Sequence, residues 1–319
     1  MTTSLPIALV VAPLSMQALQ PLSPFYRLLK WSELGDQQAF LRTHGQAVRV
    51  VITNGIAGLP AGCAEQLHQM QLIACNGVGY DAIDMQWAAQ HSVAVTNTPD
   101  VLSADVADLA MALLLAVFRQ IPQADRFVRD GQWLKGPMPL GRRVAGTRIG
   151  IVGLGKIGAL IAKRCEAFDT QVAYTGRHAQ SAVNYPFFDS ALSLAQSSDV
   201  LIVATPGGDA TRHLVNAAVL EALGPQGVLV NISRGSVVDQ AALIDALEQG
   251  RIAAAGLDVF NQEPHVPEAL TRMRQVVLSP HIASATHQTR QAMLDLLIDN
   301  VLAFTKGAPL PSQVVEQSA

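Results

Sequence analysis

The chain of 319 residues is 50% hydrophobic and 15% charged, and it carries a formal net charge of −3. This composition excludes a disordered chain, and the length suits about two globular domains with an ample core. The negative net charge and the lack of a dense Lys/Arg run argue against a nucleic-acid-binding surface, so the expected partner is a small molecule.

Short apolar runs alternate with helical stretches before residue 100. Residues 7–11, 48–53, 72–75 and 93–95 are predicted to be buried strands. The first run has no positively charged segment before it, which predicts the absence of an export signal and a cytoplasmic protein.

A helix is predicted from Ala104 to Phe118. It is apolar nearly all round, which indicates that it is buried. The apolar stretch within it, from Leu109 to Phe118, has ten residues and is too short to span a membrane, so no membrane partner is expected.

The most informative motif follows this helix. Gly153, Gly155 and Gly158 have G-x-G-x-x-G spacing between a predicted strand, 148–152, and a predicted helix, 159–168. The first glycine permits a tight turn, the second lets the backbone approach a pyrophosphate, and the third lets the helix pack on the strand. With the next strand at 171–174 this is a βαβ unit. It predicts a dinucleotide site that also includes Leu154, Lys156 and Ile157, although simple turn chemistry is the alternative.

The end of the second strand bears on the choice of cofactor. Dinucleotide-binding folds that take NAD usually carry an acidic residue about 20 residues past the glycines. Here Thr175, Arg177 and His178 lie at that place, and no carboxylate is positioned to repel a 2′-phosphate. Arg177 would attract one, so NADP(H) is preferred over NAD(H). The ordinary alternative is that Arg177 is a solvated loop cation.

Four more apolar runs follow, at 200–204, 228–231, 254–257 and 276–278. Alternation of strands with helices predicts parallel sheets covered by helices. We therefore expect an α/β protein of two domains, a Rossmann-type doubly wound parallel sheet and a flavodoxin-like substrate domain, with the cleft between them. Residues 1–98 and 288–319 are assigned to the substrate-binding domain and residues 99–287 to the dinucleotide-binding domain, with a last helix at 288–304.

Three polar residues follow strands of the predicted cofactor domain. Arg234, Glu263 and His281 each come just after an apolar run, where parallel sheets bind ligands. Each alone is more often structural: a salt-bridge partner, a loop charge and a packing residue. Together with a dinucleotide motif they predict a catalytic set.

The same segments carry a family resemblance. Residues 76–81 (Asn-Gly-Val-Gly-Tyr-Asp), Val106-Ala107-Asp108, the glycine motif, Glu263-Pro264 and Pro280-His281 resemble a D-2-hydroxy-acid dehydrogenase. The chain is similar over nearly its whole length, and within the family it is closest to the NADPH-dependent glyoxylate/hydroxypyruvate reductases.

The resemblance implies further contacts. Backbone N–H groups of Val78 and Gly79 would meet the substrate carboxylate, and Asp258 would face the nicotinamide amide. The helix at 104–118 would lie at the interface of a homodimer. Further substrate contacts are assigned to Asn54, Gly55 and Arg234, and further cofactor contacts to Thr205, Pro206, Ile232, Ser233, His281 and Ser284.

The chemistry suits these residue types. The guanidinium of Arg234 can bind the carboxylate of a 2-oxo acid and polarise its ketone. A protonated His281 would donate a proton to the ketone oxygen as hydride reaches the carbon. Glu263 would favour the imidazolium by its opposite charge and fix its orientation.

We therefore expect NADPH-dependent reduction of small 2-oxo acids, such as glyoxylate and hydroxypyruvate, to D-2-hydroxy acids. The alternatives are a reductase of a larger 2-oxo acid, such as 2-ketogluconate or an aryl-pyruvate, and a non-catalytic dinucleotide-sensing binding protein. The three cysteines lack C-x-x-C spacing, so we expect neither a disulfide nor a metal site.

Overall fold

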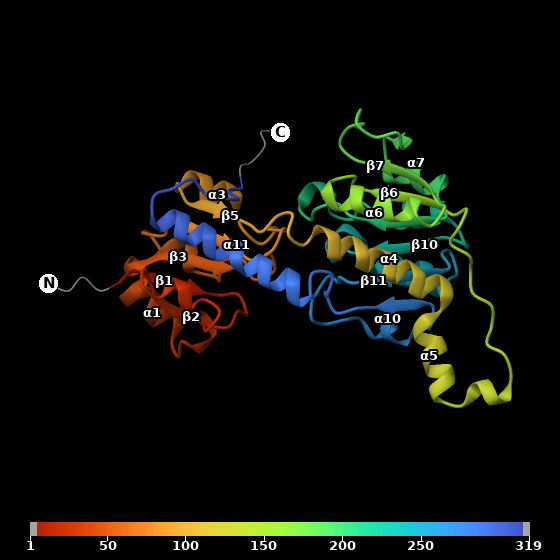
Figure 1. The fold of residues 1–319 in the computed structure, drawn as a ribbon, viewed down its shortest axis with the longest axis horizontal. Coiled ribbons are helices and arrows are strands. Elements are labelled where there is room, and N and C mark those ends of the chain that lie inside the picture. The colour runs from red at the N-terminus through yellow and green to blue at the C-terminus, as the bar shows by residue number, and fades with distance from the viewer. Residues whose placement is uncertain (1–4, 315–319) are drawn as a thin grey trace. The chain divides into compact units, whose positions relative to one another are not determined.

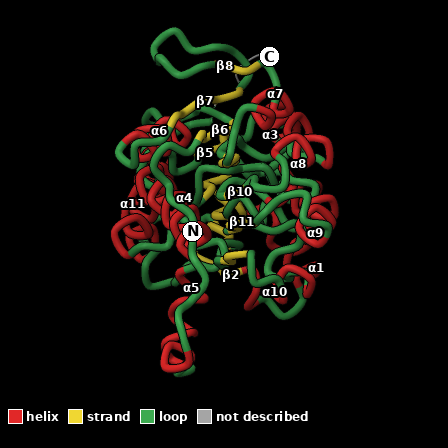
Figure 2. Tube along the Cα trace, turned by 90° about the vertical axis from the view of Figure 1, so that its right-hand side faces the viewer, coloured by secondary structure: helices red, strands yellow, loops and turns green. Residues whose placement is uncertain are grey.

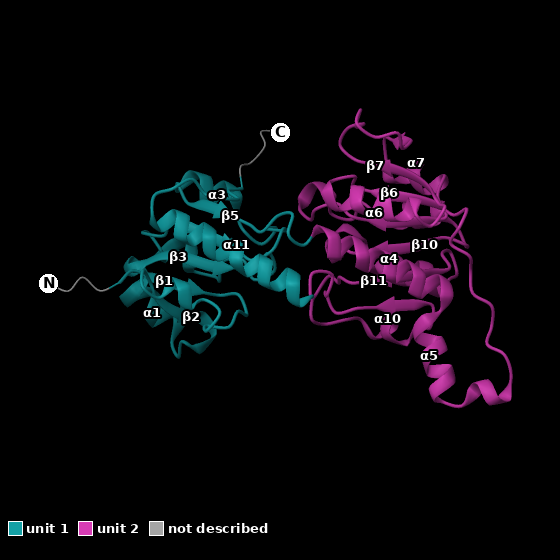
Figure 3. Cartoon of the chain, viewed as in Figure 1, with its two compact units in different colours: residues 1–102, 286–319 teal, residues 103–285 magenta. Residues whose placement is uncertain are grey.

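The computed structural model describes residues 5–314, and the chain folds into two compact units. Unit 1 comprises Met1–Leu102 and Thr286–Ala319, and unit 2 comprises Ser103–Ala285 (Figure 3). The chain leaves unit 1 after residue 102 and returns after residue 285, whereas the sequence places these limits after residues 98 and 287. Both crossings lie next to a long helix.

Unit 1 is built on a five-stranded sheet in which all strands are parallel. The strand order β2-β1-β3-β4-β5 is that of flavodoxin-like sheets, as expected. The strands are β1 Ile7–Val10, β2 Arg27–Lys30, β3 Val48–Thr53, β4 Leu72–Cys75 and β5 Ala94–Thr96.

Both faces of this sheet are apolar and covered. Successive strand residues point to opposite faces, so Leu9 and Ile73 join one core while Val10 and Leu72 join the other. The first core is completed by residues of α1 (Gln37–His44), α2 (Cys63–Gln66) and α3 (Met85–Gln90). The second is completed by Leu297, Ile298 and Val301 of α11 (His287–Thr305), which returns from the far end of the chain.

Unit 2 contains a seven-stranded parallel sheet. Its order, β12-β11-β10-β9-β6-β7-β8, is the doubly wound order with one added strand, and the strand order reverses between β6 and β9. Figure 1 labels β7, β6, β10 and β11 of this sheet. The predicted Rossmann-type sheet is confirmed. Its strands are β6 Arg148–Val152, β7 Gln171–Thr175, β8 Phe187–Phe188, β9 Val200–Val203, β10 Val228–Asn231, β11 Ala254–Leu257 and β12 Val276–Leu278.

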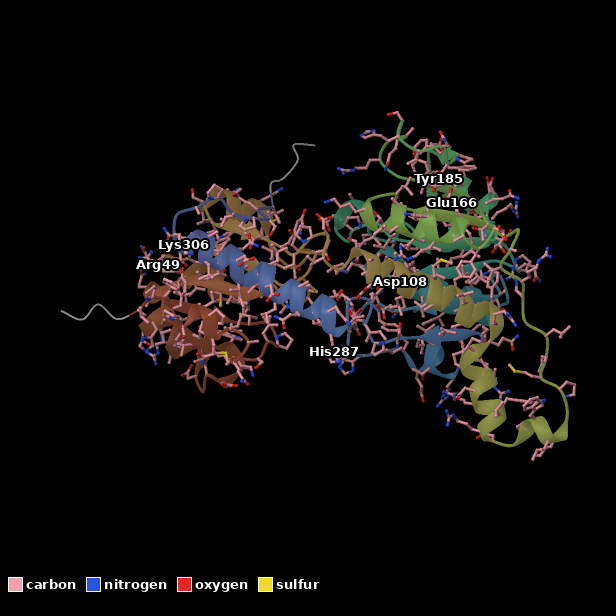
Figure 4. All side chains as sticks on the ribbon, viewed as in Figure 1. Arg49, Asp108, Glu166, Tyr185, His287 and Lys306 are labelled. Atoms are coloured by element: carbon pink, nitrogen blue, oxygen red, sulfur yellow. The ribbon has the colours of Figure 1, made fainter. Side chains whose placement is uncertain are left out.

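Helices cover both faces of the second sheet. Figure 2 shows α4 and α6 on one side of its strands and α8 and α9 on the other. Asp108 of α4 (Figure 4) accepts a hydrogen bond from Arg164 of α6 at 2.5 Å, which links the two helices. The helices are α4 Ser103–Arg119, α5 Ile121–Arg129, α6 Lys156–Glu166, α7 Ala191–Gln196, α8 Ala217–Leu223, α9 Gln240–Glu248 and α10 Glu268–Arg272.

Short 3₁₀ turns connect several of these elements. They are η1 Gln20–Leu22, η2 Trp31–Glu33, η3 Gly45–Ala47, η4 Gln132–Lys135, η5 Asp209–Thr211 and η6 Gly235–Val237. No helix among residues 5–314 is long and apolar enough to cross a membrane.

The sequence missed two strands, β2 and β8. Both lie at a sheet edge and are partly exposed, so they lack the continuous apolar run of the central strands. Helix α6 begins at Lys156 rather than Ala159, because the carbonyl of Gly155 already accepts the N–H of Ala159 at 2.8 Å. Helix α4 buries only one side, and its residues Ala104, Asp108 and Ala112 are exposed.

Candidate active site

The glycine turn after β6 is closely packed at its first and third glycines. Gly153 has φ +100°, and a Cβ on it would lie 2.9 Å from the backbone N of Thr205, which follows β9. A Cβ on Gly158 would collide with the carbonyl oxygen of Gly153. Only glycine lets the strand turn this tightly and the helix pack against the turn.

The second glycine differs from the other two. Gly155 has an ordinary negative φ, and a Cβ on it would meet no protein atom within 4 Å. It precedes the first turn of α6, whose N–H groups receive no side-chain cap from Gly155. A bare backbone beside helical N–H groups fits a pyrophosphate at the helix N-terminus. Leu154 is buried, whereas Lys156 and Ile157 begin the helix at the surface.

The end of β7 presents a basic loop. Thr175 is buried, and Arg177 and His178, which follow it in the sequence, are exposed. The loop turns back on the glycine turn, because the N–H of Gln180 donates to Tyr174 Oη and its side-chain amide donates to the carbonyl oxygen of Leu154, each at 2.6 Å. Sequence reasoning missed Gln180, since an exposed loop glutamine has no pattern that announces its partner.

His281 and Glu263 form a hydrogen-bonded pair. His281 Nδ1 lies 2.6 Å from Glu263 Oε2, and the Oε1 atom of Glu263 accepts the N–H of Phe260 at 3.0 Å. Burial favours the neutral carboxyl, but these two hydrogen bonds and the positive charge of Arg234 outweigh it and hold the pKa of Glu263 below its usual value. Glu263 is therefore a carboxylate at neutral pH, positioned to orient the imidazole.

Asp258 fixes the loop that carries His281. It is fully buried at the end of β11. Its carboxylate accepts hydrogen bonds from Ser279 Oγ at 2.6 Å and from the N–H groups of Ile282 and Ala283 at 2.9 and 3.0 Å. Burial raises the pKa of Asp258 even though these bonds favour the charged form. Since most of its acceptor capacity is used within the protein, a nicotinamide contact by Asp258 stays a prediction.

His281 itself has an unusual backbone. Its φ is +52°, and its N–H donates to the carbonyl oxygen of Asp258 at 2.9 Å. A positive φ outside glycine costs conformational energy, and the three hydrogen bonds to Asp258 hold the loop in this form. The constraint sets the direction of the imidazole.

Arg234 is positioned by the turn after β10. The side chain of Asn231 accepts from the N–H and the hydroxyl of Ser233 and donates to the carbonyl oxygen of Arg234 at 3.0 Å. A Cβ on Gly235 would collide with the backbone of Phe260, so the loops after β10 and β11 pack together. Arg234, like His281, contributes to the lowered pKa of Glu263, and all three residues lie in loops that follow strands at the same edge of the sheet.

The other predicted residues of unit 2 lie at the same edge of the sheet. Thr205 and Pro206 follow β9, Ile232 and Ser233 are buried just after β10, and Ser284 is half-buried after β12. Loops after β6, β7, β9, β10, β11 and β12 therefore all contribute to the carboxyl edge of one parallel sheet, where such sheets bind ligands.

Apart from Arg234, the predicted substrate residues lie in unit 1, after β3 and β4. A Cβ on Gly55 would collide with the carbonyl oxygen of Gly79, so these two loops touch through bare backbone. Asn54 closes its own turn by accepting the N–H groups of Ile56 and Ala57 at 3.0 and 2.7 Å. The structure thus places Asn54 and Gly55 beside the loop that contains Val78 and Gly79.

A doubly wound sheet with a glycine turn at its reversal point and a His–Glu pair at the same edge defines a dinucleotide-dependent oxidoreductase. Residues 111–283 match the family model described as D-isomer specific 2-hydroxyacid dehydrogenase, NAD binding domain. The chain belongs to this family, which confirms the resemblance seen in the sequence, and it uses a nicotinamide cofactor.

Relatives match the chain over nearly its full length. The hydroxyphenylpyruvate reductase of Plectranthus scutellarioides and the glyoxylate/hydroxypyruvate reductase A of Arabidopsis thaliana are each 42% identical over 307 residues, 96% of this chain and 98% of theirs. A solved structure, the NADPH-dependent glyoxylate/hydroxypyruvate reductase of Sinorhizobium meliloti in complex with NADP and malonate, is 40% identical with a TM-score of 0.92. The match covers 99% of this chain and 100% of that chain.

The pairing of Glu263 with His281 predicts a pH-dependent contribution to stability. We expect Glu263→Gln to lower the free energy of unfolding by about 1–2 kcal/mol at neutral pH, because a neutral amide accepts a weaker hydrogen bond than a carboxylate. Since the folded-state pKa is lowered, this difference is present above the ordinary value of 4.5 and is lost as the pH falls through the folded-state value. Urea unfolding across that range measures it.

The control is Glu268→Gln, because Glu268 is an exposed carboxylate paired with Arg272 on α10. It should change stability little at either pH. A difference between Glu263→Gln and the wild type that does not depend on pH would contradict the lowered pKa.

Proposed function

We propose that this protein reduces small 2-oxo acids, such as glyoxylate and hydroxypyruvate, to D-2-hydroxy acids with NADPH. The observation that carries this is the His281–Glu263 pair beside Arg234, at the same sheet edge as the glycine turn. A proton donor and a fixed cation next to a dinucleotide site are what reduction of a 2-oxo acid requires. The names of the Arabidopsis and Sinorhizobium relatives support this substrate class.

Arg234, His281 and Glu263 have separate roles in this reaction. The guanidinium of Arg234 binds the substrate carboxylate and polarises the ketone. NADPH, when bound, would supply the hydride to the ketone carbon. His281 donates its proton to the ketone oxygen, and the carboxylate of Glu263 orients the imidazole and stabilises its protonated form before that transfer. The product is the 2-hydroxy acid, and solvent returns the proton to His281.

We propose a separate binding role for each unit. Unit 1 is the substrate-binding domain, in which the backbone N–H groups of Val78 and Gly79 hold the substrate carboxylate, and Asn54 and Gly55 also contact the substrate. Unit 2 is the dinucleotide-binding domain, which agrees with the family model over residues 111–283. Its cofactor contacts are Gly153, Leu154, Gly155, Lys156, Ile157, Gly158, Thr175, Arg177, His178, Thr205, Pro206, Ile232, Ser233, Asp258, His281 and Ser284.

A larger substrate is the second candidate. The Plectranthus relative is named for hydroxyphenylpyruvate, so an aryl-pyruvate is an alternative to the small acids. A non-catalytic dinucleotide sensor is less well supported, because a sensor would not need the close His281–Glu263 pair.

A substrate panel tests the activity. Oxidation of NADPH is followed at fixed enzyme concentration with glyoxylate, hydroxypyruvate, phenylpyruvate and 2-ketogluconate. We expect the highest kcat/KM with the two small acids, and a kcat for His281→Ala that is lower by about 10²–10⁴-fold, since the proton donor is removed. The Kd for NADPH should change little. NADPH binding without turnover of any acid would refute the reductase proposal and favour a sensor.

We propose that Arg177 selects NADPH by pairing with the 2′-phosphate. Replacing it in Arg177→Ala should raise the KM for NADPH about tenfold or more and leave the KM for NADH unchanged, because only NADPH carries this phosphate. Arg272→Ala removes an exposed arginine of the same unit and is the control. Equal NADPH/NADH ratios in wild type and Arg177→Ala would contradict the contact.

We propose that the protein is a cytoplasmic homodimer. Trp133 and Leu134 of η4 and Leu140 of the segment after it are 69%, 93% and 95% exposed. Met138 of the same segment lines a pocket together with Phe127, Met273 and Leu278. A second copy would cover this apolar surface.

Leu134→Glu should convert the dimer into a monomer in sedimentation equilibrium, whereas a monomeric wild type would contradict the proposal. Cell fractionation tests the compartment.

A further inference from the structure

A buried amide on α11 holds the segment that follows the helix. Asn300 is fully buried, and its Nδ2 donates to the carbonyl oxygen of Leu296 and to Ser312 Oγ, each at 2.7 Å. Its Oδ1 accepts the N–H of Ser312 at 3.1 Å. Both ends of the amide are therefore paired, and two of its three bonds go to one serine. A buried polar group that is fully satisfied fixes its partners in one arrangement.

Ser312 in turn fixes the residue after β5. Its hydroxyl donates to the carbonyl oxygen of Asn97 at 2.6 Å, and the N–H of Asn97 donates to the carbonyl oxygen of Ser312 at 3.3 Å. Gln313 pairs with Thr96 in an antiparallel bridge, and the N–H of Val314 donates to Val95 at 2.8 Å. Residues 312–314 thus run along the open edge of the unit 1 sheet and hold Asn97 by its backbone.

With its backbone held, Asn97 directs its side chain at the loop after β4. Asn97 Nδ2 donates to the carbonyl oxygen of Val78 at 2.9 Å. The next residue adds a second bond, since the N–H of Thr98 donates to the carbonyl oxygen of Gly77 at 2.9 Å. Asn97 and Thr98 therefore form hydrogen bonds to two successive carbonyl groups of the loop.

Because the peptide unit is planar, fixing these carbonyl groups also fixes the N–H groups on the opposite side of the loop. In a trans peptide the C=O of one residue and the N–H of the next are rigidly opposed. Fixing the carbonyl of Gly77 therefore fixes the N–H of Val78, and fixing the carbonyl of Val78 fixes the N–H of Gly79. These are the two N–H groups assigned to the substrate carboxylate.

We propose that Asn97, held by Ser312 and Asn300, is a positioning residue that aims the N–H groups of Val78 and Gly79 at the carboxylate of the 2-oxo acid. The inference rests on the proposed function, because that function assigns the carboxylate to this loop. Asn97 acts through the loop and touches neither substrate nor cofactor in this role. The hydrogen bonds to the two carbonyl groups also polarise the peptides and strengthen the donors on their far side.

Substitution of Asn97 tests the proposal, because it should change the KM for glyoxylate and not the KM for NADPH. Asn97→Ala should raise the KM for glyoxylate about three- to tenfold, the value of one hydrogen bond, and leave the KM for NADPH within about twofold. Ser312→Ala should raise the KM for glyoxylate by a smaller factor, since it removes a bond that acts one residue further away. Unchanged KM values for glyoxylate in Asn97→Ala would overturn the proposal.

Tyr26→Phe is the matched control. Tyr26 Oη and Thr305 Oγ1 share a hydrogen bond of 2.9 Å near the end of α11, so this variant also removes one bond between α11 and the rest of unit 1. It has no contact with the loop at 76–79 among the hydrogen bonds of the described residues. A rise in the KM for glyoxylate equal to that of Asn97→Ala would mean general loosening of the unit and would overturn the positioning role.

A second measurement does not depend on turnover. Amide hydrogen exchange of the wild type and Asn97→Ala is compared over residues 76–80 and at the N–H of Thr98, with Tyr26→Phe alongside. Faster exchange at Thr98 in Asn97→Ala alone supports the positioning role, and wild-type exchange there overturns it. If the wild type reduces no 2-oxo acid, the proposed function fails, but this measurement still decides whether Asn97 orders the loop.

Discussion

The buried carboxylate of Asp258 is the interaction on which the catalytic edge of unit 2 depends. It lies at the end of β11, receives three hydrogen bonds from the segment that carries His281, and has its own backbone tied to Asn231 at the end of β10. Burying a charge is costly unless it is fully hydrogen-bonded, so the segment after β12 cannot move away without leaving that charge unpaired. The same set of bonds compensates for the positive φ of His281 and presents its imidazole to Glu263. One buried carboxylate thereby determines where the imidazole of His281 points.

The three glycines of the turn after β6 meet two different physical requirements. Gly153 and Gly158 are excluded from bearing a side chain by the protein itself, through Thr205 and through the turn's own carbonyl group. Gly155 is under no such internal restraint. A glycine at a position where the fold leaves room for a side chain keeps the backbone bare at the start of α6, which is the form that accepts an anion at a helix N-terminus. The packing thus separates the two glycines that the fold requires from the one that it does not.

Much of the fold was predictable because the central strands are buried on both faces and read as continuous apolar runs, as β4 and β9 do. The edge strands β2 and β8 lack that pattern and were missed. The positions of Arg234, Glu263 and His281 at the carboxyl edge of the sheet were predictable because each follows such a run. Asn231, Gln180 and Asn97 were not. Each serves backbone groups rather than a substrate, and the partner of Asn97, Ser312, lies 215 residues away in the sequence.

Unit 1 is assembled from the two ends of the chain, and this has a consequence for synthesis on the ribosome. One face of its sheet is covered by Leu297, Ile298 and Val301, which emerge after all of unit 2. Until then this face is covered only in part, by Leu19, Leu22 and Tyr26 of the N-terminal segment, whereas unit 2 is continuous in sequence and can fold as soon as it leaves the ribosome. The contact between α11 and the N-terminal strands also closes the longest loop of the chain, so it carries the largest entropic cost of loop closure. A nascent chain therefore leaves part of this apolar sheet face uncovered until α11 has been synthesised, so completion of the N-terminal sheet waits for a segment that follows the whole of unit 2.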